Sequence, residues 1–187
     1  MMTSIARSLL PLLFAASLPG VAGAADYAVQ PASSKLGFSS NFQGQSFDGS
    51  FGKWTATITY DPAKLNTSKF DVEVDLASVK TGDNDRDSAL PGSDFFNVAK
   101  FPKAHFVTTG FHQNGNQVVA DGNLTLRGVT KPVSLNVTFK PQGNGATLDV
   151  SGTVKRLDFG VGGGEYADTS VIGPDVKVNA HLTLTAK

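Results

Sequence analysis

The chain has 187 residues, with 16 basic and 16 acidic side chains, a formal net charge of +0 and no cysteine. This length suits a single domain with its own hydrophobic core. The absence of cysteine excludes disulfides and thiol chemistry. The balanced charge argues against nucleic-acid binding, which needs lysine and arginine in excess on one face. Buried apolar surface and backbone hydrogen bonds therefore have to hold the fold together.

The first 24 residues have the layout of a secretory signal peptide. Arg7 supplies the positive charge, residues 8–18 form an apolar run, and Ala22-Gly23-Ala24 has the small-x-small pattern of a cleavage site. The apolar run is too short to span a bilayer, which takes roughly 20 residues. The sequence predicts cleavage after Ala24, or after Ala25 as the second choice. Residues 25–187 then form the exported domain.

Apolar and polar residues alternate along most of the exported domain, which is the period of a half-buried β-strand. Turn residues such as Asp61-Pro62 and Asn114-Gly115-Asn116 separate the alternating runs. Strands this amphipathic need a shared dry interior and no exposed edge, so the sequence predicts an all-β fold with a single closed antiparallel β-barrel. A two-sheet sandwich is the alternative. The eight predicted strands lie within residues 36–42, 54–60, 70–76, 105–111, 118–126, 133–139, 148–154 and 176–184.

Residues 82–102 break this alternation. Aspartates precede a short run of helix formers, which predicts one or two helical turns with an aspartate N-cap. A loop of this length typically covers a barrel mouth or carries function. The spacing Asp83-x-Asp85-x-Asp87 is that of a calcium loop, but Ser88 stands where the sharp turn needs glycine. We therefore favour a capped lid segment, paired with Arg86, over a calcium site.

A barrel of eight strands can be filled by side chains or can leave room for one small ligand. Small residues at the inward positions Ala56, Ala120, Gly122, Gly152 and Ala180 favour a hollow interior. The alternative is that the two glycines relieve strand bending at barrel corners. Because the inward register carries no charge, the predicted cavity suits an apolar ligand. The candidate lining residues are Phe38, Phe42, Trp54, Ile58, Val74, Phe106, Leu124, Leu135, Val150 and Leu184, with Phe95 and Phe96 as candidates to close one end.

Three basic residues are candidate contacts for an anionic head group: Arg86, Arg127 and Lys131. The latter two flank a turn, and a solvated hairpin tip is the more common role for such residues. The three histidines are scattered along the chain, so we predict no metal site and no catalytic group.

Five stretches of the chain carry a family resemblance: Asp83 to Asp87, Ser93-Asp94-Phe95-Phe96-Asn97-Val98, Phe101-Pro102, the run from Gly122 to Val133, and Lys155-Arg156-Leu157-Asp158-Phe159-Gly160. Together they resemble the YceI-like family of bacterial periplasmic proteins. The resemblance implies a lipocalin-like eight-stranded barrel in the periplasm. It also implies a polyisoprenoid, a quinone tail or a similar long-chain amphiphile in the lumen, and no cofactor besides this bound lipid. The segment from Gly160 to Gly164 is richer in glycine than the family pattern, which leaves the head-group preference of that mouth open.

The sequence thus predicts a periplasmic carrier for one long-chain lipid, acting as a monomer or homodimer and not as an enzyme. One alternative is a filled barrel that serves as a structural or protein-interaction module for an inner-membrane redox protein. A lipid-modifying enzyme is a further alternative, but it would need an acid–base pair in the cavity, and Asp94 with Arg86 is a weak candidate.

Overall fold

The computed structural model describes residues 24–187, and these form one antiparallel sheet with one short α-helix. The predicted signal peptide lies, apart from Ala24, outside the described residues and stays a prediction. The strands are β1 Ala25–Val29, β2 Lys35–Phe42, β3 Gln45–Phe51, β4 Trp54–Tyr60, β5 Lys69–Asp75, β6 Val79–Lys80, β7 Lys103–Asn114, β8 Gln117–Leu126, β9 Val129–Gln142, β10 Gly145–Lys155 and β11 Asp175–Ala186. The helix α1 is Asn84–Ala89, and 3-10 turns lie at Pro31–Ser33, Leu65–Thr67, Leu76–Ser78, Arg156–Phe159 and Gly164–Tyr166.

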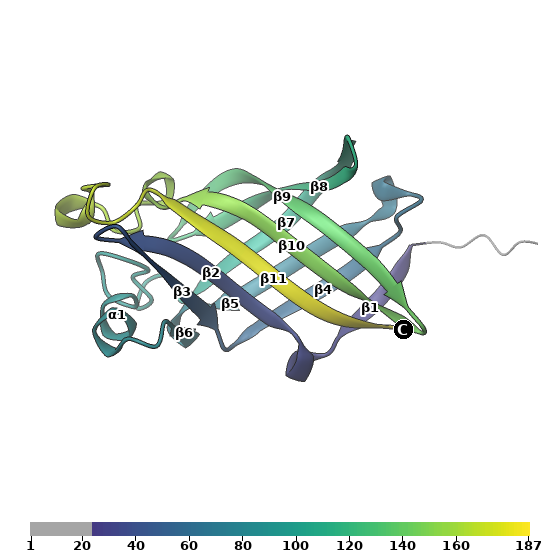
Figure 1. Ribbon diagram of the computed structural model, residues 1–187, viewed down its shortest axis with the longest axis horizontal. Helices are drawn as coiled ribbons and strands as arrows, with labels where there is room; N and C mark the ends of the chain where they lie inside the picture. Colours follow the sequence, from purple (N-terminus) through teal and green to yellow (C-terminus); the bar gives the residue numbers. More distant parts are fainter. Residues whose placement is uncertain (1–23) are drawn as a thin grey trace, which may run out of the picture.

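The sheet closes on itself through its first strand. Strand β1 pairs with β4 on one side and with β11 on the other, so β1, β4, β5 and β7 to β11 form a closed ring of eight antiparallel strands (Figure 1). This confirms the predicted all-β barrel and excludes the sandwich. Strand β11 is long enough to pair with β1 near its C-terminal end and with β2 along residues 177–181. Strands β2, β3 and β6 therefore extend the wall at the end where α1 lies.

The predicted strands match eight of the observed strands, but three strands were missed. β6 has two residues, which is too short to show a period of two. β1 has five residues, but Tyr27, Ala28 and Val29 are consecutive apolar residues and break the alternation. β3 was missed because polar residues fill most of its positions. The predicted strand 105–111 is the centre of the longer β7, which carries a bulge between Thr108 and Gly110.

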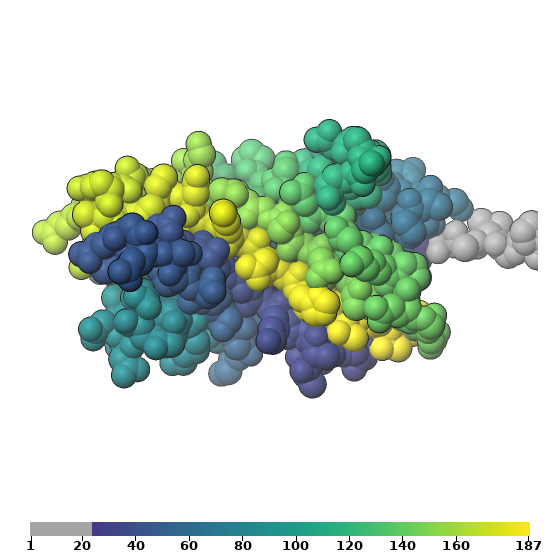
Figure 2. Space-filling model, viewed as in Figure 1, coloured from purple at the N-terminus to yellow at the C-terminus, as the bar shows by residue number. Residues whose placement is uncertain are grey.

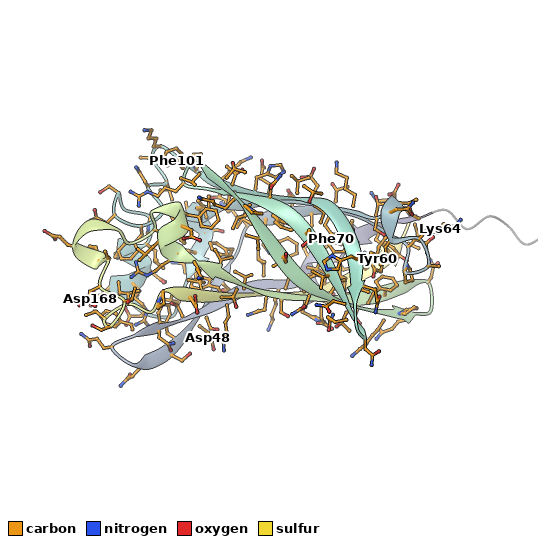
Figure 3. The ribbon with its side chains drawn as sticks, turned by 90° about the horizontal axis from the view of Figure 1, so that it is seen from above. Asp48, Tyr60, Lys64, Phe70, Phe101 and Asp168 are labelled. Atoms are coloured by element: carbon orange, nitrogen blue, oxygen red, sulfur yellow. The ribbon has the colours of Figure 1, made fainter. Side chains whose placement is uncertain are left out.

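Aromatic side chains fill the barrel at the end away from α1. Tyr60 lies 4.8 Å from Phe139, and Phe70 lies 4.9 Å from Phe111, measured between ring centroids. Figure 3 shows Tyr60 and Phe70 side by side, far from Asp48 and Asp168 at the other end. Each such pair contributes about 0.5–1.5 kcal/mol beyond the burial of its surface. We call this region the closed end.

The opposite end, which we call the lid end, is covered by irregular segments. α1 and residues 90–102 connect β6 to β7, and residues 156–174 connect β10 to β11. Figure 2 shows these segments gathered around the β2–β3 hairpin at one end of the molecule. Within residues 24–187 no helix is long and apolar enough to cross a membrane.

Candidate functional site: the barrel cavity and its mouth

A cavity of about 580 Å³ lies between the closed end and the lid end. Its size falls within the range of about 300–1,000 Å³ that is typical of small-ligand sites. The wall is built from the inward side chains of β2 to β5 and β7 to β11, most of them aliphatic or aromatic. The structure places every candidate lining residue on this wall except Leu184, which packs in the closed-end cluster with Tyr60 and Phe70. Phe95 and Phe96 line the cavity at the lid end.

The free volume does not come from the two glycines that the sequence suggested. A Cβ at Gly122 would lie 2.5 Å from the ring of Phe106, and a Cβ at Gly152 would lie 2.5 Å from Leu135 Cδ2. Each glycine thus lets a large side chain of the neighbouring strand lie flat against the wall. Ala120 is fully buried in the closed-end cluster and is not part of the cavity wall either.

Ala56 and Ala180 do line the cavity. The expectation that small inward residues leave space therefore holds for these two alanines and fails for the other three positions. The physical reason is cross-strand packing, because a small residue leaves space only where no large neighbour leans over it.

The lid helix has the predicted cap. The Asp83 side chain accepts a hydrogen bond of 2.9 Å from the Arg86 backbone N–H, and its carboxylate lies 3.5 Å from Arg86 Nη1. Asp87 accepts hydrogen bonds from the backbone N–H and the hydroxyl of Thr81, and the hydroxyl bond holds the pKa of Asp87 below its ordinary value. These bonds fix α1 over the edge of the barrel. Within residues 24–187 there is no group of three or more acidic, histidine or cysteine side chains that could hold a metal ion.

The cavity is not free of charge, contrary to the expectation from the inward register. Arg156 is 3% exposed and lines the cavity at the lid end, and burial lowers the pKa of its guanidinium. Five N–H donors are all that a guanidinium has, and each is used within the lid. The acceptors are the backbone carbonyls of Val161, Gly162, Tyr166, Ile172 and Gly173.

One residue of the glycine-rich loop, Gly162, is explained by this arginine. Gly162 has a φ of +62°, which L-residues rarely adopt, and a Cβ there would lie 2.7 Å from Arg156 Nη1. The loop can therefore wrap closely around the guanidinium. Arg156 serves to hold residues 161–173 together, and it has no free donor for a ligand.

Of the three basic candidates, Arg86 lies at the cavity mouth, and Arg127 and Lys131 lie outside the cavity. Arg86 lines the mouth and its guanidinium carbon lies 4.6 Å from the centre of the Phe47 ring. Arg127 donates to the carbonyls of Ser93, Asp94 and Gly160, so it ties the β8–β9 turn to both lid segments. Arg127 and Lys131 do not belong to the cavity wall. A contact of either residue with a head group stays a prediction.

Several residues of the wall were not among the candidates. Phe47 and Phe51 come from β3, which was not predicted. The ring centroid of Tyr166 lies 5.0 Å from that of Phe95, so these two rings join the two lid segments. Ser40 lies on the inward face of β2 between two phenylalanines. The signal for Ser40 was present in the sequence, since a polar residue interrupts an otherwise apolar face.

A closed antiparallel barrel that is filled at one end and hollow toward a covered mouth belongs to the class of small β-barrels with an internal cavity. The sequence pattern of the YceI-like domain matches residues 27–184. The chain therefore belongs to the YceI-like domain family.

Two relatives and two solved structures illustrate this similarity. A UPF0312 protein of Pseudomonas savastanoi pv. phaseolicola is 36% identical over 154 residues, which cover 77% of this chain and 80% of the relative. A UPF0312 protein of Yersinia pestis is 39% identical over 119 residues, covering 60% and 62%. BcnA of Burkholderia cenocepacia superposes with a TM-score of 0.80 at 32% identity, covering 83% of this chain and 99% of that protein. A polyisoprenoid binding domain of Saccharophagus degradans has a TM-score of 0.65 at 18% identity, covering 88% and 99%, which shows a shared fold alone.

Proposed function

We propose that this protein is a periplasmic binding protein that holds one long-chain amphiphile, of the polyisoprenoid, quinone or fatty-acyl type, with its tail in the barrel cavity. The observation that carries the proposal is the apolar cavity of about 580 Å³, which is blocked by aromatic rings at one end and reaches the lid at the other. A polyisoprenoid binding domain shares the fold, which adds support. The resemblance of residues 1–24 to a signal peptide supports the periplasmic location.

The length of the cavity sets the length of tail that it can enclose. Val176 and Leu182 on β11 both line it, and they are six residues apart. Six residues span about 20 Å along a strand, and a tilt of about 35–45° reduces this to about 15 Å along the barrel axis. An extended chain advances roughly 1.2 Å per bond, because three backbone bonds span about 3.6 Å. A straight tail of about 12 carbons fills this stretch of the wall. A longer tail continues along the lid residues that also line the cavity, folds back, or extends past the mouth.

Burial of the tail supplies the affinity. At about 0.8 kcal/mol per buried methylene, about 12 carbons give a gross gain of about 10 kcal/mol. Association and ordering cost about 4 kcal/mol or more. The affinity therefore rises with tail length until the cavity is full and then levels off.

The experiment fills the cavity with a larger side chain. Ala56 lines the cavity, and its neighbour Thr57 is exposed on the outer face of β4. Ala56→Phe should lower the fraction of protein that carries a ligand, and Thr57→Phe should leave it unchanged. Native mass spectrometry of freshly purified protein measures this fraction, and circular dichroism checks that both variants are folded.

Three results decide the matter. Loss of ligand in Ala56→Phe with retention in Thr57→Phe supports the cavity as the site. Equal ligand occupancy in the two variants contradicts it. A bare mass for the wild type, with no binding of added prenol, favours the protein-interaction alternative over the carrier.

A further inference from the structure

Two buried side-chain polar atoms in residues 24–187 have no hydrogen-bond partner: Ser40 Oγ and Arg86 Nε. Both residues line the cavity, and Ser40 is 5% exposed. A buried polar group without a partner costs roughly 1–3 kcal/mol. An acceptor that reaches these groups recovers this energy, so they mark the position where a ligand gains the most from an oxygen atom.

The two groups flank one aromatic ring. Ser40 on β2 pairs with Phe47 on β3, and the side chains of directly paired residues lie on the same face of a sheet. The Arg86 guanidinium stacks over the Phe47 ring at 4.6 Å. The shared contact with Phe47 therefore places both unpaired groups in the same part of the cavity wall. Figure 1 shows that α1 lies at the end of the barrel that β2 and β3 extend. A head group there would have its tail directed into the apolar part of the barrel.

The charges at this place do not favour an anion. Asp83 balances Arg86 at 3.5 Å, and Asp85 adds a second carboxylate to the cavity wall. Lys80 and Asp87 lie 3.6 Å apart as a further pair. Arg156 uses its donors on lid carbonyls, as described above. A phosphate would meet the carboxylates of the mouth, whereas a neutral acceptor oxygen meets two free groups without this repulsion.

We propose that Ser40 Oγ and Arg86 Nε form an oxygen-binding point that receives a carbonyl, hydroxyl or ether oxygen of a neutral amphiphile and discriminates against a phosphorylated one. The hydroxyl of Ser40 can donate or accept, and Arg86 Nε donates. This inference rests on the proposed function and specifies the chemical class of the head group. Arg86 then acts through its Nε–H and its stacking on Phe47, and its net charge is neutralised by Asp83.

The test compares three probes with the same C20 prenyl tail: geranylgeraniol, the matching hydrocarbon and geranylgeranyl monophosphate. Trp54, the single tryptophan of the chain, lines the cavity and reports binding through its fluorescence. We expect the wild-type protein to bind the alcohol at least tenfold more tightly than the hydrocarbon. We expect the monophosphate to bind no more tightly than the alcohol.

The variants locate the effect. Ser40→Ala and Arg86→Met should each bring the alcohol-to-hydrocarbon affinity ratio toward one while the hydrocarbon affinity is retained. Ser39→Ala is the matched control, because Ser39 is the neighbouring serine on the other face of β2 and is not part of the cavity wall. Its ratio should equal that of the wild type.

Each outcome has one meaning. An unchanged ratio in both Ser40→Ala and Arg86→Met overturns the oxygen-binding point but leaves the cavity as a lipid site. A monophosphate that binds tenfold more tightly than the alcohol overturns the preference for a neutral head group. If neither the alcohol nor the hydrocarbon binds to the wild type, the proposed function itself fails.

Discussion

Replacing Arg156 by methionine should loosen the lid without removing the cavity. The change keeps an unbranched apolar stem and removes the five donors that hold residues 161–173. Two of the five acceptors belong to the buried residues Val161 and Gly162 and cannot easily gain water instead. At roughly 1–3 kcal/mol for each buried acceptor, these two cost about 2–6 kcal/mol. Relief of the desolvated guanidinium charge offsets part of this.

The expected net loss in the free energy of unfolding is therefore about 2–5 kcal/mol. For a domain of this size it corresponds to a fall in melting temperature of roughly 5–15 °C. Urea unfolding followed by Trp54 fluorescence and by far-ultraviolet circular dichroism measures the loss. Limited proteolysis should show cleavage within residues 161–173 before cleavage of the strands.

Arg127 provides the matched control. It also donates to three loop carbonyls, but it lies on the outside of the barrel, where water can replace it. Arg127→Met should therefore cost less than about 1 kcal/mol. The reasoning is refuted if Arg156→Met unfolds within experimental error of the wild type, or if the two variants lose the same stability.

Three further predictions concern the wall, the lid helix and the closed end. Gly122→Leu should prevent folding instead of merely blocking the cavity, because its Cβ would lie 2.7 Å from the Val107 carbonyl oxygen; soluble protein of wild-type stability would contradict this. The hydrogen bond from the Thr81 hydroxyl is the main cause that lowers the folded-state pKa of Asp87. The Asp87 carboxylate therefore contributes its full stabilisation above about pH 4, and this stabilisation is lost as the pH falls through the lowered pKa. Asp87→Asn should accordingly reduce the acid dependence of hydrogen exchange in α1, and an unchanged dependence would count against it. Phe70→Ala should cost about 3–5 kcal/mol of unfolding free energy and leave the cavity wall in place, which urea unfolding and prenol binding would show together.

The barrel could be predicted from the sequence because its signal is local. A strand with one dry face alternates every two residues, and Trp54, Ile58 and Tyr60 show this within a single segment. The same alternation predicts which residues face inward, which is why most of the candidate lining residues lie on the cavity wall. It does not predict which inward residues lie at the filled end. That depends on the pairing of Leu184 with Val29 in the closing strand β1, whose residues do not alternate and so give no strand signal.

The free volume and the lid depend on contacts between distant segments. Whether Gly122 leaves space is decided by Phe106 on the neighbouring strand, and the register between β7 and β8 that brings them together includes a bulge. The role of Arg156 is decided by carbonyls up to 17 positions away in the sequence. Every residue carries a backbone carbonyl, so the sequence does not mark which carbonyls an arginine binds. An arginine of this kind can be told from a surface arginine only when the conformation of the loop is known.

The two ends of the barrel are held by different forces, and this difference bears on where a long tail can leave the cavity. At the closed end, β1 is joined to both β4 and β11 by backbone ladders, and aromatic rings fill the interior. At the lid end, residues 90–102 and 156–174 lie outside the strands. They are held by backbone hydrogen bonds of their turns and by the carbonyl contacts of Arg127 and Arg156, without a β-ladder. Segments outside the ladders open at lower free energy than paired strands. The lid end therefore opens more easily, and Ser40 and Arg86 lie at this end. A ligand whose head-group oxygen binds these two residues has its head at the lid end. A tail that is too long for the cavity leaves through the same end.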